Sequence, residues 1–396
     1  MLCLFNRKKK FSNDNPQSVL IDSGGASGDR FGNAVALSAD GSTAIVGSSL
    51  DDVGANNDQG SAIVFTKSGN PWNEETKLLD STGSAQDGFG NDVALSDDGN
   101  TALVGSYFKS GKGAAIVFTR SGGIWTQQAE LTDSTGAANN YFGLSVALSS
   151  DGNTALVGSP YSAVGGTNAA GSVLVFTRSG GIWTQQTRLS YSAKTSGDQF
   201  GFRVALSADN TTALIGVIGD DPNGKSNQGS AVVFTQSMGT WTEQSTLTYN
   251  TFQTFNFFGY SVALSNDGNT ALVGASGGQY AVVFTRSGST WTLENVFTGT
   301  GSSTGFGRVV ALSGEGDIAL IGAPLDDVPS IDQGSVTLFI KRDGVWSEET
   351  TLVDNNLYVD NFFGTSVALS KNNNIILIGA TGFASNRGYA KALYRR

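Results

Sequence analysis

Short apolar runs alternate with polar turns along this chain, and the same order of runs returns seven times. The best-preserved run is Val-Ala-Leu-Ser or a close variant, and a Phe-Gly pair precedes it in every copy. The pairs begin at Phe31, Phe89, Phe142, Phe200, Phe258, Phe306 and Phe363. Successive pairs lie 48 to 58 residues apart. Self-similarity at such a period indicates one structural unit copied along the chain.

The second copy shows how each unit is expected to fold. Apolar runs at 93–96 and 101–105 flank Asp98-Gly99, and Asp-Gly between apolar runs is a strong signal for a β-hairpin. A third apolar run, 114–119, is followed by a Ser-Gly-Gly turn and by an alternating run at 125–131. Alternation of apolar and polar residues is typical of a half-exposed strand. Each unit is therefore predicted to contain four antiparallel strands, which we name A to D.

The four strands differ in polarity, which predicts how the units are arranged. Strand A carries small residues and varies least, whereas strand D is more polar and carries a Trp in six copies. Strand A is therefore expected to lie innermost and strand D outermost, with Trp and Phe filling the wider outer gaps between sheets. Sheets that face each other around an axis form a β-propeller. The predicted fold class is all-β, a seven-bladed β-propeller of four-stranded antiparallel blades.

The two ends of the chain are expected to share the seventh blade. The last copy supplies only strands A to C, between residues 363 and 394. Leu20 precedes Phe31 by eleven residues, the spacing between the last Leu of strand D and the next Phe-Gly in five of six complete units. Residues 14–20 should therefore form the missing strand D and close the ring, which removes exposed sheet edges. The expected organisation is an N-terminal overhang at 1–13 and a single propeller domain at 14–396.

Composition excludes several classes of function. The net charge of −10 opposes binding to nucleic acids and to anionic membrane surfaces. Histidine, the commonest general base, is absent, and the single cysteine, Cys3, permits no intrachain disulfide. No run is long enough to span a bilayer, and residues 1–5 are too short for the apolar core of a signal peptide. We therefore expect neither nucleic-acid binding nor membrane insertion, and the compartment and oligomeric state stay open.

Phe-Gly, a Val-Ala-Leu strand and a following Gly-Ala-Pro resemble the FG-GAP repeat. The sixth copy has the pattern in full, from Phe306-Gly307 to Gly322-Ala323-Pro324, and the resemblance covers residues 14–394. FG-GAP repeats form the seven-bladed propeller heads of integrin α subunits and many bacterial surface proteins. The resemblance implies adhesion or binding at a cell surface or outside the cell. It also implies that partners engage the face that carries the D–A and B–C loops.

Some FG-GAP proteins bind calcium in the A–B turn through an Asp-x-Asp-x-Asp-Gly loop. The A–B turns of this chain depart from that pattern, because each offers one or two acidic side chains in a tight turn. Calcium takes six to eight oxygen ligands. We therefore expect plain hairpin turns that hold no metal, and no cofactor.

Paired acidic residues in three B–C loops are the first candidates for a binding site. The pairs are Asp51-Asp52, Asp220-Asp221 and Asp326-Asp327. They predict either a cation site or an acidic rim for a basic partner. The alternative is that they are solvated loop acids that keep the protein soluble.

Aromatic residues in the loops are the second candidates. Phe252 and Phe255 lie in the D–A loop before the fifth copy, and the corresponding loops are rich in Ser, Thr, Gly and Asn. Tyr107, Phe108 and Tyr161 lie at the starts of two B–C loops. Exposed aromatic residues on a polar rim often mark a contact surface. The alternative is that these side chains pack beneath their own loops.

The sequence favours a non-enzymatic binding, adhesion or scaffolding module that engages a protein or glycan partner through the D–A and B–C loop face. One alternative is a structural subunit of a larger surface or virion assembly. Another is a hydrolase, which would rely on carboxylates for acid–base chemistry. The sequence contains no motif that brings two carboxylates together, so this chain is not expected to be an enzyme.

Overall fold

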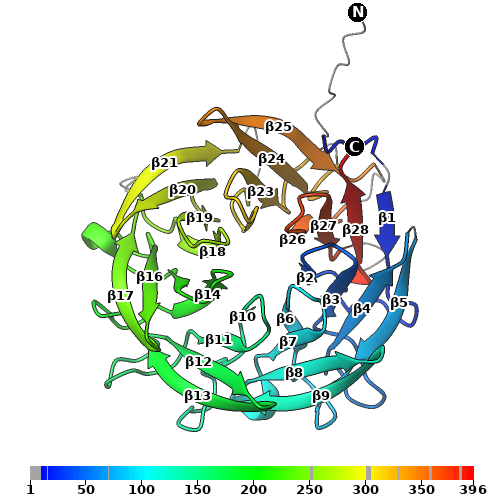
Figure 1. Cartoon of the computed structure of the whole chain (residues 1–396), viewed down its shortest axis with the longest axis horizontal. Helices are drawn as coiled ribbons and strands as arrows, with labels where there is room; N and C mark the ends of the chain where they lie inside the picture. Colours follow the sequence, from blue (N-terminus) through cyan, green and yellow to red (C-terminus); the bar gives the residue numbers. More distant parts are fainter. Residues whose placement is uncertain are drawn as a thin grey trace, which may run out of the picture.

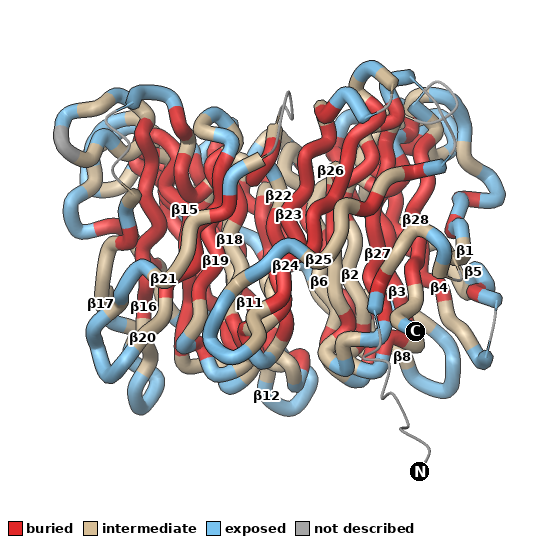
Figure 2. The backbone as a smooth tube through the Cα atoms, turned by 90° about the horizontal axis from the view of Figure 1, so that it is seen from above, coloured by how far each residue is buried: buried red, intermediate tan, exposed pale blue. Residues whose placement is uncertain are grey.

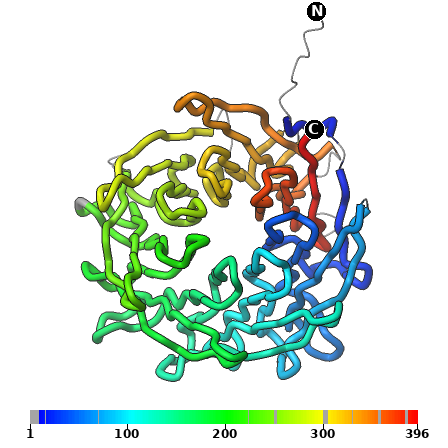
Figure 3. The backbone as a smooth tube through the Cα atoms, viewed as in Figure 1, coloured from blue at the N-terminus to red at the C-terminus, as the bar shows by residue number. Residues whose placement is uncertain are grey.

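The computed structural model describes residues 10–15, 17–69, 71–249, 253–299, 305–328, 330–355, 359–382 and 386–396. Its strands form seven separate four-stranded antiparallel sheets, which stand around a common axis (Figure 1). The chain passes once around the ring from its N-terminal to its C-terminal end (Figure 3). The predicted fold class is therefore confirmed.

Blades one to four each consist of four strands, in the order A to D. Blade one has β2 (Ala34–Leu37), β3 (Thr43–Ser48), β4 (Ser61–Lys67) and β5 (Trp72–Leu78). Blade two has β6 (Phe89–Leu95), β7 (Thr101–Ser106), β8 (Ala114–Ser121) and β9 (Ile124–Leu131). Blade three has β10 (Val146–Leu148), β11 (Thr154–Ser159), β12 (Ser172–Ser179) and β13 (Ile182–Leu189). Blade four has β14 (Phe200–Leu206), β15 (Thr212–Val217), β16 (Ser230–Ser237) and β17 (Thr240–Leu247).

The remaining blades follow the same plan. Blade five has β18 (Phe258–Leu264), β19 (Thr270–Ala275), β20 (Tyr280–Ser287) and β21 (Thr290–Thr298). Blade six has β22 (Val309–Leu312), β23 (Ile318–Ala323), β24 (Ser335–Arg342) and β25 (Val345–Val353). Blade seven has β26 (Phe363–Leu369), β27 (Ile375–Ala380), β28 (Tyr389–Tyr394) and β1 (Gln17–Leu20). Two short 3-10 helices, η1 (Lys109–Gly111) and η2 (Pro222–Gly224), lie in B–C loops. In the described part of the chain, no helix has the length and apolar character needed to cross a membrane.

The first strand of the chain closes the ring, as predicted. β1 pairs antiparallel with β28, with Gln17 opposite Leu393 and Leu20 opposite Ala390. Figure 1 shows β1 beside β28, where the two ends of the chain meet. Phe11, from the segment expected to overhang, is 2% exposed and belongs to the core between blades six and seven. The first part of that segment, residues 1–9, lies outside the described residues.

The hydrophobic core lies between the blades rather than within any one of them. Each of the seven buried clusters draws its side chains from two neighbouring blades, such as Val64 of blade one with Phe89 and Val104 of blade two. Strands B and C are mostly buried, whereas the outer strand D is largely half-buried or exposed (Figure 2). A blade can bury its faces only against neighbours, so the closed ring is the stable unit.

The Phe-Gly pair joins each blade to the preceding one. Phe89 is fully buried, and its N–H donates to the carbonyl oxygen of Gln59 at 2.9 Å. Gly90 has a φ of +90°, and a Cβ there would lie 2.2 Å from the carbonyl oxygen of Ser61. Only glycine tolerates both the positive φ and this close backbone approach. The pair is therefore a joint between sheets.

Two residues of the Val-Ala-Leu-Ser run have distinct structural roles, one at the centre of the ring and one in the A–B turn. The leucine of every copy lines the central channel near the A–B turns, around a cavity of about 180 Å³. The serine stabilises the turn: Ser96 Oγ accepts the N–H of Thr101 at 2.9 Å and donates to Asp98 Oδ1 at 2.6 Å. The turn acid is therefore hydrogen-bonded to its own hairpin.

Candidate functional site

Four aromatic side chains from two neighbouring blades meet on the D–A and B–C loop face. Tyr107 and Phe108 follow β7, Tyr161 follows β11, and Tyr141 lies in the D–A loop between blades two and three. The ring centroid of Tyr141 lies 5.7 Å from that of Tyr107, 6.0 Å from that of Phe108 and 5.0 Å from that of Tyr161. We call these four residues the aromatic cluster. The structure thus brings together three residues that the sequence singled out separately.

Tyr141 is the centre of the aromatic cluster, and the sequence reasoning missed it. It stands directly before Phe142-Gly143 and has a φ of +53°, as do Phe257 and Phe362 at the same repeat position. Aligning the repeats by their Phe-Gly pairs would have placed Tyr141 between the two B–C loops. Loop composition alone gave no reason to choose it.

A cavity of about 290 Å³ opens beside the aromatic cluster. Tyr107, Phe108 and Tyr141 line it together with Leu50, Asp58, Gln86 and Gly88. Burial raises the pKa of the Tyr107 hydroxyl, and the neighbouring Tyr141 and Asp58 raise that pKa further. The hydroxyl therefore stays neutral at physiological pH and can both donate and accept hydrogen bonds. The cavity combines apolar ring surface with a few polar groups, as small-ligand sites do.

Further aromatic and cationic residues continue from the cluster around the same face. The rings of Phe202 and Tyr260 lie 5.1 Å apart, and the guanidinium of Arg308 lies 5.8 Å from the Tyr260 ring. Burial raises the pKa of Tyr161, and the nearby hydroxyls of Tyr141 and Tyr260 add to this shift. Tyr260 therefore lies near enough to Tyr161 to influence its pKa.

Of the two aromatic residues predicted for the D–A loop before blade five, only Phe255 is described, and it lies apart from the aromatic cluster. Phe252 falls outside the described residues. Phe255 is 54% exposed, its ring lies 6.2 Å from that of Phe257, and its N–H donates to the carbonyl oxygen of Ser226. Among the described residues, no ring contact connects Phe255 to the aromatic cluster. Its role in binding stays a prediction.

The paired acids of the B–C loops are divided between two environments. The first acid lies inward: Asp51 is 4% exposed and Asp326 is 5% exposed, whereas Asp220 is half-buried. The second acid is exposed and accepts a backbone N–H of its own loop. These bonds are Asp52 with Asp58 at 2.9 Å, Asp221 with Asn227 at 2.6 Å and Asp327 with Asp332 at 2.9 Å. The pairs shape their loops in three separate blades, and their role in ligand binding stays a prediction.

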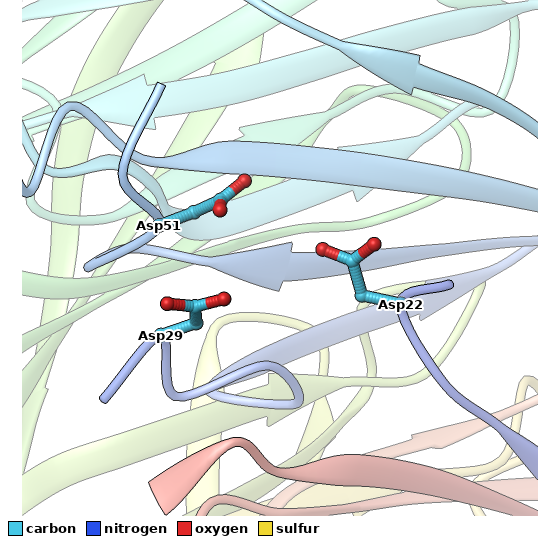
Figure 4. Close-up of side chains that lie close together, drawn as sticks. All are labelled: Asp22, Asp29 and Asp51. Carbon is cyan, nitrogen blue, oxygen red and sulfur yellow. The ribbon is translucent and has the colours of Figure 1, made fainter. Parts of the chain in front are cut away.

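Asp51 belongs to a buried cluster of three carboxylates. Asp22 and Asp29, which the sequence reasoning missed, point toward it from the D–A loop (Figure 4). Carboxylate oxygens of the three residues lie within 4.8 Å of one another. Lys77 Nζ bonds Asp22 Oδ2 at 2.7 Å and Asp51 Oδ2 at 2.9 Å. Burial raises the pKa of Asp29, and the charges of Asp51 and Asp22 raise it further.

Buried ion pairs like that of Lys77 also occur at other blade junctions. A buried D–A loop aspartate recurs at three of them, and its cation comes from a B–C loop, from strand D as Lys77 does, or from strand C. These pairs are Asp80 with Lys109, Asp133 with Arg188 at 2.7 Å, and Asp354 with Lys391 at 2.9 Å. Oxygens of the first cluster could hold a divalent cation only if Lys77 moved away, because its ammonium occupies the same space. We therefore interpret the cluster as a structural ion pair at a blade junction.

The fold defines a propeller built from seven copies of one repeat, and comparison with family models agrees with the repeat. The FG-GAP repeat model matches residues 15–65, 72–118, 125–176, 183–234 and 241–293, which is more than half of the chain. The chain therefore belongs to the FG-GAP repeat family. The first match begins just before β1, so the family pattern itself includes the strand that closes the ring.

Comparisons with curated proteins and with solved structures add the fold alone. No curated protein matches the chain. Among solved structures, the chain is similar to a putative 6-phosphogluconolactonase from Bacteroides uniformis ATCC 8492, with 12% sequence identity and a TM-score of 0.59. That likeness covers 81% of this chain and 85% of the other. At this identity it carries no information about activity.

Proposed function

We propose that this FG-GAP propeller is a non-enzymatic binding module that takes a carbohydrate ligand at the aromatic cluster. The observation that carries the proposal is the meeting of four rings from two blades beside a cavity of about 290 Å³. Sugar rings present apolar C–H faces that pack on aromatic rings, and hydroxyls that bond to side chains such as Asp58. The concave shape suits a sugar better than a protein surface, which needs a broad area of contact.

The non-enzymatic part of the proposal rests on where the perturbed carboxylates lie. Asp29 has a raised pKa and faces two other carboxylates, an arrangement that acid–base catalysis could use. All three are buried at a blade junction, however, and Lys77 neutralises part of their charge. None of them lines the cavity beside the aromatic cluster. A substrate held by the rings would therefore not reach them.

The experiment that tests this function is a glycan array probed with the whole chain, followed by calorimetry with the strongest ligand. Tyr141→Ala should weaken binding by about tenfold or more, because the ring contacts three others and a ligand would bury it. Phe255→Ala is the matched control, since it removes an exposed aromatic from another D–A loop. Failure of every oligosaccharide to bind at millimolar concentration would contradict the proposal. Loss with Phe255→Ala alone would move the site to the loop before blade five.

A second candidate function, a subunit of a larger assembly, is favoured by apolar residues at the C–D turns. These are Ile124 at 69% exposure, Ile182 at 69%, Met238 at 101% and Val345 at 67%. Exposed apolar residues that recur on one side of a molecule can form contacts between copies. Light scattering across a concentration series tests this function. Concentration-dependent association that Ile124→Ser and Ile182→Ser abolish would support it, and a monomer at all concentrations would contradict it.

A further inference from the structure

Two arginines line a second cavity on the same face, and neither has an acidic partner among the described residues. The cavity has a volume of about 300 Å³, and Arg30 and Arg308 contribute to its wall. Arg30 precedes Phe31-Gly32 in blade one, and Arg308 follows Phe306-Gly307 in blade six. Both side chains are exposed. An unpaired guanidinium offers several N–H donors in one plane.

The lining of this cavity selects for negative charge. Among the described residues, no acidic side chain lines it, although the chain carries 34 acids and only 24 bases. Thr381 and Asn386 add a hydroxyl and an amide, and Leu325 and Phe362 add apolar surface. Two arginines without a carboxylate among the described lining residues favour a carboxylate or sulfate ligand, since guanidinium groups bind such groups with paired hydrogen bonds.

The arginine cavity is a neighbour of the aromatic cluster. Ser49 lines the arginine cavity and the next residue, Leu50, lines the aromatic one. Arg30 is close enough to Tyr107 to lower its pKa, against the larger effects of burial, Tyr141 and Asp58 that raise it. On the other side, Arg308 lies over the ring of Tyr260, whose hydroxyl slightly raises the pKa of Tyr161. One ligand of several sugar units could therefore contact both places.

We propose that the ligand of this face is an acidic oligosaccharide, whose acidic group binds between Arg30 and Arg308 while a neighbouring sugar ring packs on the aromatic cluster. This inference rests on the proposed carbohydrate-binding function and adds the chemical class of the ligand. A neutral sugar would leave both guanidinium groups without an acidic partner. An acidic sugar placed only on the aromatic cavity would instead meet the carboxylate of Asp58.

The test uses uronate- and sialate-bearing oligosaccharides, each beside its carboxyl-reduced form, in calorimetric titrations with the whole chain. The acidic form should bind about tenfold or more tightly than its reduced form. Arg30→Gln with Arg308→Gln should abolish that preference and leave affinity for the reduced form unchanged. Lys112→Gln with Lys225→Gln is the matched control, because it removes two positive charges from B–C loops outside the cavity. The control should keep the preference.

The outcomes separate this inference from the function on which it rests. Equal binding of acidic and reduced forms, with both lost in Tyr141→Ala, would overturn the acidic ligand and keep the carbohydrate site. A preference that the lysine control removes as fully as the arginine variant would show general charge attraction and would also overturn the inference. Absence of binding by either form would overturn both proposals.

Discussion

Single residues in this propeller are repeated because each performs a defined task at a blade joint or a turn. The serine that ends Val-Ala-Leu-Ser shows this well. In the second copy, its Oγ satisfies the N–H of Thr101, which is buried, and orients Asp98. The same pair of bonds recurs in other copies, as in Ser38 with Thr43 and Asp40. A buried N–H that loses its partner costs more free energy than a hydrogen bond gains.

Replacing this serine should destabilise the protein without changing its fold. Ser96→Ala is expected to lower the free energy of unfolding by about 1–3 kcal/mol, because it leaves the Thr101 N–H unsatisfied. Chemical denaturation followed by tryptophan fluorescence measures the change. Ser121→Ala, an exposed residue near a turn, is the control and should change stability by less than about 0.5 kcal/mol. Equal effects of the two substitutions would refute this account of the serine.

The glycine of Phe-Gly provides a second prediction at this scale. Gly90→Ala should prevent the close approach of β6 to blade one, because the new Cβ would meet the Ser61 carbonyl oxygen at 2.2 Å. Gly123 has a φ of +79°, and a Cβ added there would have no atom within 4 Å, so Gly123→Ala adds only the cost of a positive φ. That cost is about 1–2 kcal/mol. Thermal unfolding should therefore show a much larger loss for Gly90→Ala, and similar losses would show that the steric contact is unimportant.

The roles of this serine and this glycine could be predicted from the repeat, whereas the residues of the candidate site could be predicted only in part. Phe-Gly and Val-Ala-Leu-Ser recur because every joint needs them. Tyr141 occurs once, and its importance depends on Tyr107 and Tyr161, which reach it from different loops. The role of Asp22 likewise depends on Asp51 and Lys77, because Lys77 forms ion pairs with both carboxylates. Contacts between loops of different blades form only when the ring closes, so the order of residues along the chain does not reveal them.

At the scale of strands, neighbouring blades are joined by a bulge that the sequence did not predict. In blade two, the pairing of β8 with β9 shifts between Val117 and Phe118, which leaves Gln128 of β9 without an opposite residue. Gln128 Oε1 instead accepts hydrogen bonds from Arg178 and Trp183 of blade three, both at 3.0 Å. An alternating pattern predicts a strand but does not reveal where its register shifts. Trp183 therefore connects two blades, as expected of the outer tryptophans, through a bulge that only the structure shows.

The buried ion pair of blade seven offers a prediction about these junctions. Lys391→Met should lower the free energy of unfolding by about 3–5 kcal/mol, because the Asp354 carboxylate, 1% exposed, would lose its countercharge. Adding Asp354→Asn should recover part of that loss, since a neutral amide needs no countercharge. Urea denaturation of the single and double variants measures both steps. A double variant no more stable than Lys391→Met would contradict the role assigned to the pair.

At the scale of the whole molecule, the ring consists of seven interfaces between neighbouring blades, and the short strand β1 completes the last blade. Every core cluster spans two blades, so losing one junction exposes apolar surface on both sides. β1 is only four residues long and supplies strand D of the last blade. The sequence predicted this closure because the spacing from Leu20 to Phe31 repeats that of the other units. Spacing is preserved at the closure because the chain must follow the same path at every junction.

The pH dependence of stability follows from two groups of aspartates with opposite shifts. In the A–B turns, burial tends to raise the pKa of Asp98, but hydrogen bonds from Ser96 and Asn100 outweigh this effect. The pKa of Asp98 therefore lies below its usual value. The same balance lowers the pKa of Asp40, Asp151, Asp209 and Asp267. These carboxylates stabilise the folded state above the unfolded pKa of about 3.9, and that stability is lost as the pH falls through their folded pKa. Burial instead raises the pKa of Asp29, Asp87, Asp92, Asp220 and Asp326.

Carboxylates whose pKa is raised in the folded state favour folding at low pH, and this contribution is lost as the pH rises through their folded pKa. The two groups together predict that the free energy of unfolding is highest near the unfolded aspartate pKa of about 4 and declines on both sides. Urea denaturation at about pH 2.5, 4 and 7 measures the curve. Asp98→Asn should flatten the acid side, and Asp92→Asn the neutral side, because each removes one titrating group from its set. A curve that rises steadily to neutral pH would show that the buried carboxylates do not oppose folding.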